Sequence, residues 1–314
     1  MSKYNFKTVS LSMKGEGKLP DISMQTAMEL VALACPGISE ALLSDESTAP
    51  IDGAHLFATF RGEDRIMMAV NPRLAALVLG GIFRAAKETG SAFQVELAHS
   101  ESTGKRTGYV GITPIELAMI ARYYAKMHGV KAWGLHADHL PHKLAKQVFE
   151  YSDPAMLEAD YQAMIKKMQK EALDYWIEAG ATSYAPDTSY LFDMNPALRV
   201  VGITGNWRTD FDPEFTPENI AKTREQLKWV VRAFVDQTIY IRERLGHNRF
   251  SAEGEVGEIG WTVDGKKVLT TPLEACVWNL LVKEELEKRG YHIRQEGETD
   301  PEMKGIDIDR KSVV

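Results

Sequence analysis

The sequence has few cysteines and no long apolar run. Only two cysteines, Cys35 and Cys276, occur in 314 residues, which is too few for a zinc-finger set and is typical of a reducing compartment. The apolar run Leu74–Phe83 is about half of the roughly twenty residues that a bilayer-spanning helix needs. The first residues carry charges, glycine and proline in place of an apolar signal segment. We therefore expect a cytoplasmic protein with no transmembrane helix.

Positive charge is also in short supply. The chain has 37 Lys and Arg against 44 Asp and Glu, a net charge of −7, and no dense basic run. Such a chain is a poor non-specific binder of nucleic acid or of an anionic membrane, although local basic pockets for phosphate stay compatible with it. We expect neither nucleic acid nor a membrane as a partner.

No Gly-x-Gly-x-x-Gly or P-loop pattern follows the first predicted strand, which argues against a nucleotide-binding doubly wound sheet. From about residue 65, short apolar runs instead alternate with long helical patterns. This alternation predicts parallel strands with helical crossovers. We predict an α/β fold of the TIM (β/α)8-barrel type, with a doubly wound sheet as the alternative. The barrel is expected to be incomplete, or completed by N-terminal strands at 8–13 and 55–61 or by a second chain.

The predicted elements divide the chain into three parts. An N-terminal extension over 1–64 would pack on a barrel domain over 65–295, and a polar, flexible tail would follow over 296–314. Thr113 with Glu116, and Thr271 with Glu274, match the capping box at a helix start. The predicted strands are 66–70, 92–97, 131–136, 181–186, 198–203, 250–257 and 291–294, and the predicted helices are 23–34, 72–88, 114–128, 154–178, 217–245 and 272–289.

Polar residues that could carry chemistry follow several predicted strands, where a barrel places its active site. The strongest pattern is the run His136–His139, with Lys143 soon after it. Imidazole nitrogens bind zinc-like ions and a neighbouring carboxylate can move protons, so the pattern favours a metal or catalytic site over a polar loop. Strand alternation would also point Glu253 and Glu255 to one side, where a carboxylate pair inside a barrel mouth needs a cation or a proton. Solvated acids on an exposed edge strand explain this pair about equally well.

Weaker signals follow two other strands. Asp187 could be a ligand or accept a substrate hydroxyl, and a plain turn explains it equally well. Ser100 and Ser102 could hold phosphate or sugar oxygens, against the commoner explanation of a flexible loop.

Four blocks of the sequence occur in the order Gly108–Pro114, His136–His139, Ala179–Asp187 and Glu253–Gly257. In this order they resemble the class II (metal-dependent) ketose-bisphosphate aldolase superfamily, in its tagatose-bisphosphate aldolase subunit branch. The resemblance implies a divalent cation, Zn²⁺ first and Mn²⁺ or Co²⁺ as alternatives, that stabilises the enediolate formed when the C3–C4 bond of a phosphorylated ketose breaks. We predict Asp138 and Glu255 as catalytic residues, His136, His139, Asp187 and Glu255 as metal ligands, and Ser100, Ser102, Lys143 and Asp187 as substrate contacts.

Two departures from that family keep other functions open. The family takes two further histidines from beyond the last block and has a Gly/Ser-rich phosphate loop, whereas here His292 is the only histidine after Gly257 and no Gly-Gly-Ser loop follows. The segment 270–294 also resembles a block of the tagaturonate epimerases, which move a proton without breaking the carbon chain. The alternatives are therefore a metal-dependent sugar or uronate epimerase, or a non-catalytic barrel subunit of an aldolase complex. In each case we expect a homo-oligomer or a partner subunit.

Overall fold

The computed structural model describes residues 45–60, 67–195, 197–198, 215–257, 261–263, 266–268, 270–295, 298–300 and 302–309. A seven-stranded sheet forms its centre, and every neighbouring pair of strands in that sheet is parallel. In spatial order the strands are β1 (Met68–Val70), β2 (Phe93–Ala98), β3 (Trp133–Pro141), β4 (Ser183–Asp187), β5 (Ser251–Glu253), β9 (Gly305–Asp309) and β8 (His292–Ile293).

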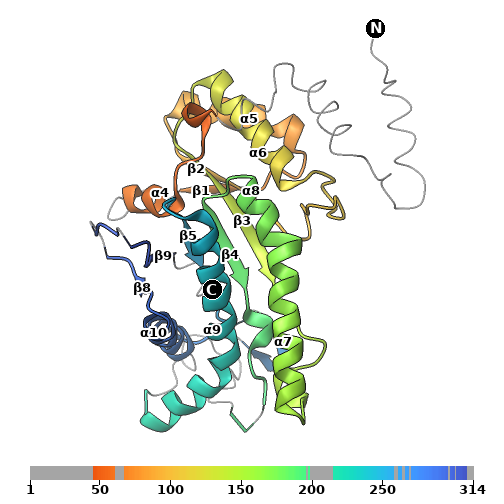
Figure 1. The fold of residues 1–314 in the computed structure, drawn as a ribbon. Coiled ribbons are helices and arrows are strands. Elements are labelled where there is room, and N and C mark those ends of the chain that lie inside the picture. Colours follow the sequence, from red (N-terminus) through yellow and green to blue (C-terminus); the bar gives the residue numbers. More distant parts are fainter. Residues whose placement is uncertain are drawn as a thin grey trace, which may run out of the picture.

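The first five strands lie side by side in chain order, without the reversal that defines a doubly wound sheet. The helices between them also contact one another in chain order, as the layer of helices in Figure 1 shows. Within the described residues, β1 and β8 are not paired with each other. The structure therefore establishes an α/β fold with a parallel sheet. Within the described residues it does not establish that this sheet closes into the predicted barrel.

Most predicted helices are confirmed, with their start signals. Helix α6 begins after the Thr113 capping box and α10 after the Thr271 capping box, with Pro at the first helical position of each. The larger helices are α5 (Ala75–Thr89), α6 (Pro114–His128), α7 (Pro154–Met168), α8 (Asp174–Glu178), α9 (Pro217–Leu245) and α10 (Pro272–Lys288), with the π-helical turn η3 (Gln169–Leu173) between α7 and α8. Short turns η1 (Glu46–Thr48), η2 (Val148–Glu150) and η4 (Ser189–Leu191) and a hairpin of β6 (Trp261–Val263) and β7 (Lys266–Val268) complete the described elements.

Alternation along the strands separates an apolar face from a polar one. Val95, Leu97 and Leu135 are fully buried and belong to the core cluster shared with the helices. The intervening positions on the same strands carry polar groups, such as Glu96 and His136, which are paired in register. This polar face leads to the carboxyl ends of the strands, where the candidate site lies.

Residues 55–61 were predicted as a strand, and this prediction is wrong for the part that the structure describes, which forms helix α4 (Gly53–Phe60). Backbone hydrogen bonds from Ile51 to Trp133 and from Gly53 to Thr182 seat this segment across the amino ends of β3 and β4. A Cβ on Gly53 would come within 2.4 Å of Ser251 Oγ, so glycine permits the close approach. The segment thus covers the end of the sheet and does not add a strand to it.

The predicted flexible tail is also corrected. Residues 305–309 form β9, which inserts between β5 and β8. The acidic side chain of Asp307 on this strand forms ion pairs with Arg249 at 2.9 Å and with Arg294 at 3.1 Å. Ile306 is fully buried. A segment that looks solvated from its composition is therefore part of the sheet.

Several other predictions meet the structure only in part. Strand β3 runs on to Pro141, so the predicted metal motif lies within the end of the strand and not in a loop after it. The predicted strands at 8–13 and 198–203 and the predicted helix at 23–34 fall on residues outside the described ranges. Within those ranges, no helix has the length and apolar character needed to cross a bilayer.

Candidate functional site

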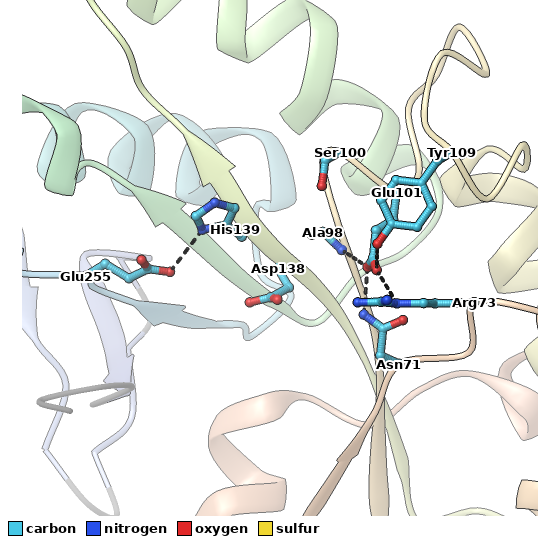
Figure 2. Close-up of a pocket in the computed structure, with 9 residues that line it drawn as sticks. All are labelled: Asn71, Arg73, Ala98, Ser100, Glu101, Tyr109, Asp138, His139 and Glu255. Carbon is cyan, nitrogen blue, oxygen red and sulfur yellow. Dashed lines mark hydrogen bonds and ion pairs between the residues drawn. The ribbon is translucent and has the colours of Figure 1, made fainter. Parts of the chain in front are cut away.

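A cavity of about 350 Å³ lies over the carboxyl ends of the first strands (Figure 2). This is the end of a parallel α/β sheet at which active sites are built. Its size falls at the lower end of small-molecule pockets, roughly 300–1,000 Å³. The cavity is lined by Asn71, Arg73, Ala98, Ser100, Glu101, Tyr109, Asp138, His139 and Glu255.

An irregularity at the end of β3 brings Asp138 and His139 to the same site. In a regular strand, successive side chains point to opposite faces of the sheet. Here the register with β4 shifts between Ala137 and Leu140, and His139 has a φ of 44°. Bulges of this kind turn a side chain in a new direction, and a non-glycine residue in the left-handed region costs of order 1–3 kcal/mol. The surrounding fold holds His139 in this backbone conformation, and the conformation directs its side chain toward the site.

His139 forms the first cluster of candidate ligands together with Asp187 and Glu255. Its Nδ1 lies 3.2 Å from Asp187 Oδ2 and 3.7 Å from Glu255 Oε1. One ligand atom from each of the three side chains lies within 4.8 Å of the others. An imidazole with two carboxylates is a donor set that suits a divalent ion such as Zn²⁺ or Mn²⁺.

Negative charge from the nearby acids helps to raise the pKa values of two members of this cluster, His139 and Asp187. The ion pair with Glu255 is the main cause that raises the pKa of His139 to about 9, and the charges of Asp187 and Asp138 act in the same direction against burial. Burial raises the pKa of Asp187 to about 7, and the nearby charge of Glu255 adds to that effect. The acids therefore stabilise positive charge at this point, either a proton on the imidazole or a cation in its place.

Asp187 is fully buried and is supported from two sides. Its Oδ1 accepts hydrogen bonds from the backbone N–H of Ser189 at 3.1 Å and from the Ser189 hydroxyl at 2.5 Å. Its carbonyl oxygen accepts from the backbone N–H of His142 at 2.8 Å. The His142 ring is fully buried, with Nδ1 2.8 Å from the Leu140 carbonyl oxygen and Nε2 2.8 Å from Gln237. His142 is thus a supporting residue behind the site.

His136 belongs to a second cluster and not to the first. Its Nε2 lies 3.5 Å from Asp138 and 3.6 Å from Glu253, and the ring is fully buried. Glu96 completes a group in which the ligand atoms of Glu96, His136 and Asp138 lie within 4.8 Å of one another. The predicted four-ligand set is therefore divided by the structure: His139, Asp187 and Glu255 form one cluster, and His136 lies in the other, beside Asp138.

The predicted substrate contacts have different fates. Ser100 is exposed and lines the cavity. Ser102 is corrected, because it is fully buried and donates to the Ile112 carbonyl oxygen at 2.8 Å, where it supports a loop. Asp187 is fully buried and does not line the cavity, and Lys143 does not line it either. Its Nζ lies 3.7 Å from the centre of the Tyr190 ring, and that ring is 6.4 Å from the His139 ring.

Four polar residues of the cavity lining and Glu96 were absent from the predicted site. Asn71 directly follows β1, so the rule that points to strand ends could have found it. Glu96 could have been found by alternation, since it stands opposite His136 in the register of β2 and β3. Glu101 lies between Ser100 and Ser102 in the segment that follows β2, so the same rule could have found it, and Tyr109 lies within the block Gly108–Pro114. Arg73 carries no such local signal, and its contact with Glu101 forms only in the folded chain.

No family model matches this chain, and no curated protein matches it. A solved structure of a probable tagatose 6-phosphate kinase from Sinorhizobium meliloti 1021 is similar in part, with 15% identity and a TM-score of 0.41. The similarity covers 72% of this chain and 46% of that protein, so the chain spans about half of the neighbour's length.

Proposed function

We propose that this chain is a divalent-metal-dependent enzyme of carbohydrate metabolism, and that it cleaves or forms the C3–C4 bond of a phosphorylated ketose. The observation that carries the proposal is the cluster of His139, Asp187 and Glu255, of which His139 and Glu255 line the cavity together with Asp138. The ordered blocks that resemble the class II aldolases point to the same chemistry. The proposal also takes the sheet as part of a TIM-type barrel, which the chain-order winding of β1 to β5 favours.

His139, Asp187 and Glu255 would hold the cation. When bound, a divalent ion polarises a carbonyl and stabilises negative charge on its oxygen. The protein's own contribution is to keep these donors convergent, through the bulge at His139 and the buried hydrogen bonds of Asp187.

Asp138 is the candidate for proton transfer. It lines the cavity, its side chain is 19% exposed, and buried His136 lies 3.5 Å away. In the cleavage direction its carboxylate would take the proton of the C4 hydroxyl as the C3–C4 bond breaks and the electron pair moves toward the ketone to give an enediolate. In the reverse direction the same group would return that proton to the aldehyde oxygen.

Metal analysis of the full-length protein, before and after chelation and reloading with Zn²⁺, Mn²⁺ or Co²⁺, tests the cation site. His139→Ala should lower the bound metal, and His128→Ala, which changes a histidine outside the cavity, should not. A screen of phosphorylated ketoses for cleavage then tests the reaction. Asp138→Asn should keep the metal and lose about 10²–10⁴-fold in rate, the usual contribution of a general acid or base. A protein that binds none of these metals and cleaves none of these ketoses would refute the proposal.

A second candidate is a metal-dependent epimerase of a sugar or uronate. It is favoured by the lining of the cavity, in which Arg73 is the only lysine or arginine among the described residues. A bisphosphate would call for more positive charge than one side chain provides. Incubation of hexuronates and ketose phosphates that yields epimers, without shorter products, would select this reaction over the aldol cleavage.

A further inference from the structure

Opposite the His139 cluster, the cavity carries a second group of side chains, formed by Asn71, Arg73 and Tyr109 around Glu101 (Figure 2). We propose that these side chains, through Arg73, bind a single anionic group of the substrate, which is a carboxylate or a phosphate monoester. The inference rests on the proposed function for what happens at the other end of the ligand. It adds the chemical class of the substrate.

Glu101 is the anchor of this group and is not itself a free ligand. Its Oε1 accepts from Arg73 Nε at 3.0 Å and from the Tyr109 hydroxyl. Its Oε2 accepts from Asn71 Nδ2 at 2.6 Å and from the Ala98 backbone N–H at 2.8 Å. The Glu101 side chain is 2% exposed. Both oxygens are therefore occupied, and Glu101 holds its neighbours in place around the cavity.

Arg73 keeps the binding edge of its guanidinium group available. In the described part of the chain it donates through Nε alone, and its side chain is 68% exposed. Its guanidinium carbon lies 5.7 Å from the centre of the Tyr109 ring, so Glu101 and the ring restrict it from two directions. The two Nη groups of an arginine form a planar fork that matches a carboxylate or a phosphate.

The charge distribution along the cavity sets the orientation and the number of anionic groups. Asp138 and Glu255 line the cavity away from Arg73, and Figure 2 shows Asp138 between the His139–Glu255 pair and the Arg73 group. A ligand anion placed against those carboxylates is repelled. At the other end the carboxylate of Glu101 is paired with Arg73, whose two Nη groups can still donate to an anion. Arg73 is the single lysine or arginine of the described lining, which suits one anionic group and not two.

The remaining groups near Arg73 fit a polyhydroxylated chain. The Ser100 hydroxyl and the Asn71 amide are neutral and line the same cavity. A bound sugar acid or sugar phosphate would lie with its anionic end at Arg73 and its reacting carbons beside Asp138. Arg73 is thus assigned as a residue that determines substrate specificity.

The test compares three small probes of the same carbon skeleton, namely glycerol, glycerate and glycerol 3-phosphate, titrated into the full-length protein without metal. At least one anionic probe should bind about 10- to 100-fold more tightly than glycerol, the size of a charge-assisted hydrogen-bonded contact. The tighter of the two anions identifies the group as carboxylate or phosphate. Arg73→Gln should abolish the preference, and Arg73→Lys should keep part of it. Arg84→Gln, a change at an exposed arginine of α5 outside the cavity, should leave the preference intact.

A separate titration with Mn²⁺ alone distinguishes the inference from the proposed function. Wild type and Arg73→Gln should bind Mn²⁺ equally, because Arg73 lies outside the His139 cluster. Mn²⁺ binding without any preference for the anionic probes, or a preference that survives Arg73→Gln, overturns the inference and leaves the proposed function standing. An Arg73-dependent preference in a protein that binds no Mn²⁺ supports the anion site and counts against the proposed function.

Discussion

The placement of Asp187 depends on a buried histidine, His142, and a buried glutamine, Gln237. Burial lowers the pKa of His142 to about 4, so its ring is neutral at neutral pH. Since Nδ1 faces two carbonyl oxygens, it carries the hydrogen, and Nε2 accepts from the Gln237 amide. The Gln237 amide also donates to the Ile165 carbonyl oxygen at 3.2 Å. These contacts join the end of β3, the end of β4 and helix α9.

Gln237→Leu should destabilise the fold by about 1–3 kcal/mol. The substitution nearly conserves volume but leaves the buried Nε2 of His142 without its hydrogen-bond donor. Urea unfolding measures the change. Gln226→Leu is the matched control, because Gln226 lies on the same helix, is also buried, and makes one amide contact at 3.5 Å. An equal loss in both variants would show that the His142 contact contributes nothing specific.

Between elements, the carboxyl end of β5 approaches α10 through a glycine. A Cβ on Gly254 would come within 2.1 Å of the Trp278 ring, which is itself buried. Gly254 lies between Glu253 and Glu255, which face His136 and His139 respectively. The helix therefore sets how far these two acids reach into the site.

Gly254→Ala should destabilise the protein by about 1–3 kcal/mol through overpacking against Trp278. Thermal or urea unfolding measures this change. Gly81→Ala is the control, since a Cβ there meets nothing within 4 Å, and in helix α5 it should stabilise by about 0.5–1 kcal/mol. If Gly254→Ala were as stable as wild type, the contact between β5 and α10 would be looser than the structure describes.

Helices α7 and α9 are joined by a pair of charges with a defined pH dependence. Arg232 donates to both oxygens of Glu158 at 2.6 and 2.7 Å and lies over the Tyr161 ring. The hydrogen bond from Arg232 is the main reason that the pKa of Glu158 falls from 4.5 to about 2. Because the folded state binds the proton less readily than the unfolded chain, this stabilisation is complete above pH 4.5 and is lost as the pH falls toward 2.

Glu158→Gln should therefore cost stability near pH 7 and progressively less below pH 4.5. Glu158 is 44% exposed, so we expect a small cost that salt reduces further. Urea unfolding of both proteins from pH 7 to pH 3 measures it. Glu88→Gln, in the exposed pair of Arg84 and Glu88, serves as the control and should show little change with pH. A constant difference between Glu158→Gln and wild type across this range would contradict the assignment.

For the molecule as a whole, the C-terminal strand completes the sheet. Strand β9 separates β5 from β8, and Arg294 holds it through Asp300 at 3.2 Å and Asp307 at 3.1 Å. The Arg294 side chain is only 8% exposed, so these pairs are largely shielded from solvent. The segment is therefore part of the cooperative fold.

Ile306→Ala should lower the free energy of unfolding by about 2–5 kcal/mol, the cost of a large-to-small change in a core. A flexible tail would show no such effect. Calorimetry or urea unfolding gives the value, and Glu302→Ala at an exposed position of the same segment should stay within about 0.5 kcal/mol. Equal stability of Ile306→Ala and wild type would place β9 outside the folded unit.

The parts that sequence alone determined are those with local causes. Capping boxes at Thr113 and Thr271 act within four residues, and the alternation of apolar strands and helices predicts the parallel sheet. The motif from His136 to His139 was located at the end of a strand for the same reason. Tertiary structure decided the rest, because the causes lie far apart in the chain. The orientation of His139 depends on the register between β3 and β4. The position of β9 depends on its ion pairs with Arg249 and Arg294, and the position of Arg73 depends on Glu101. All these contacts form only when the chain folds.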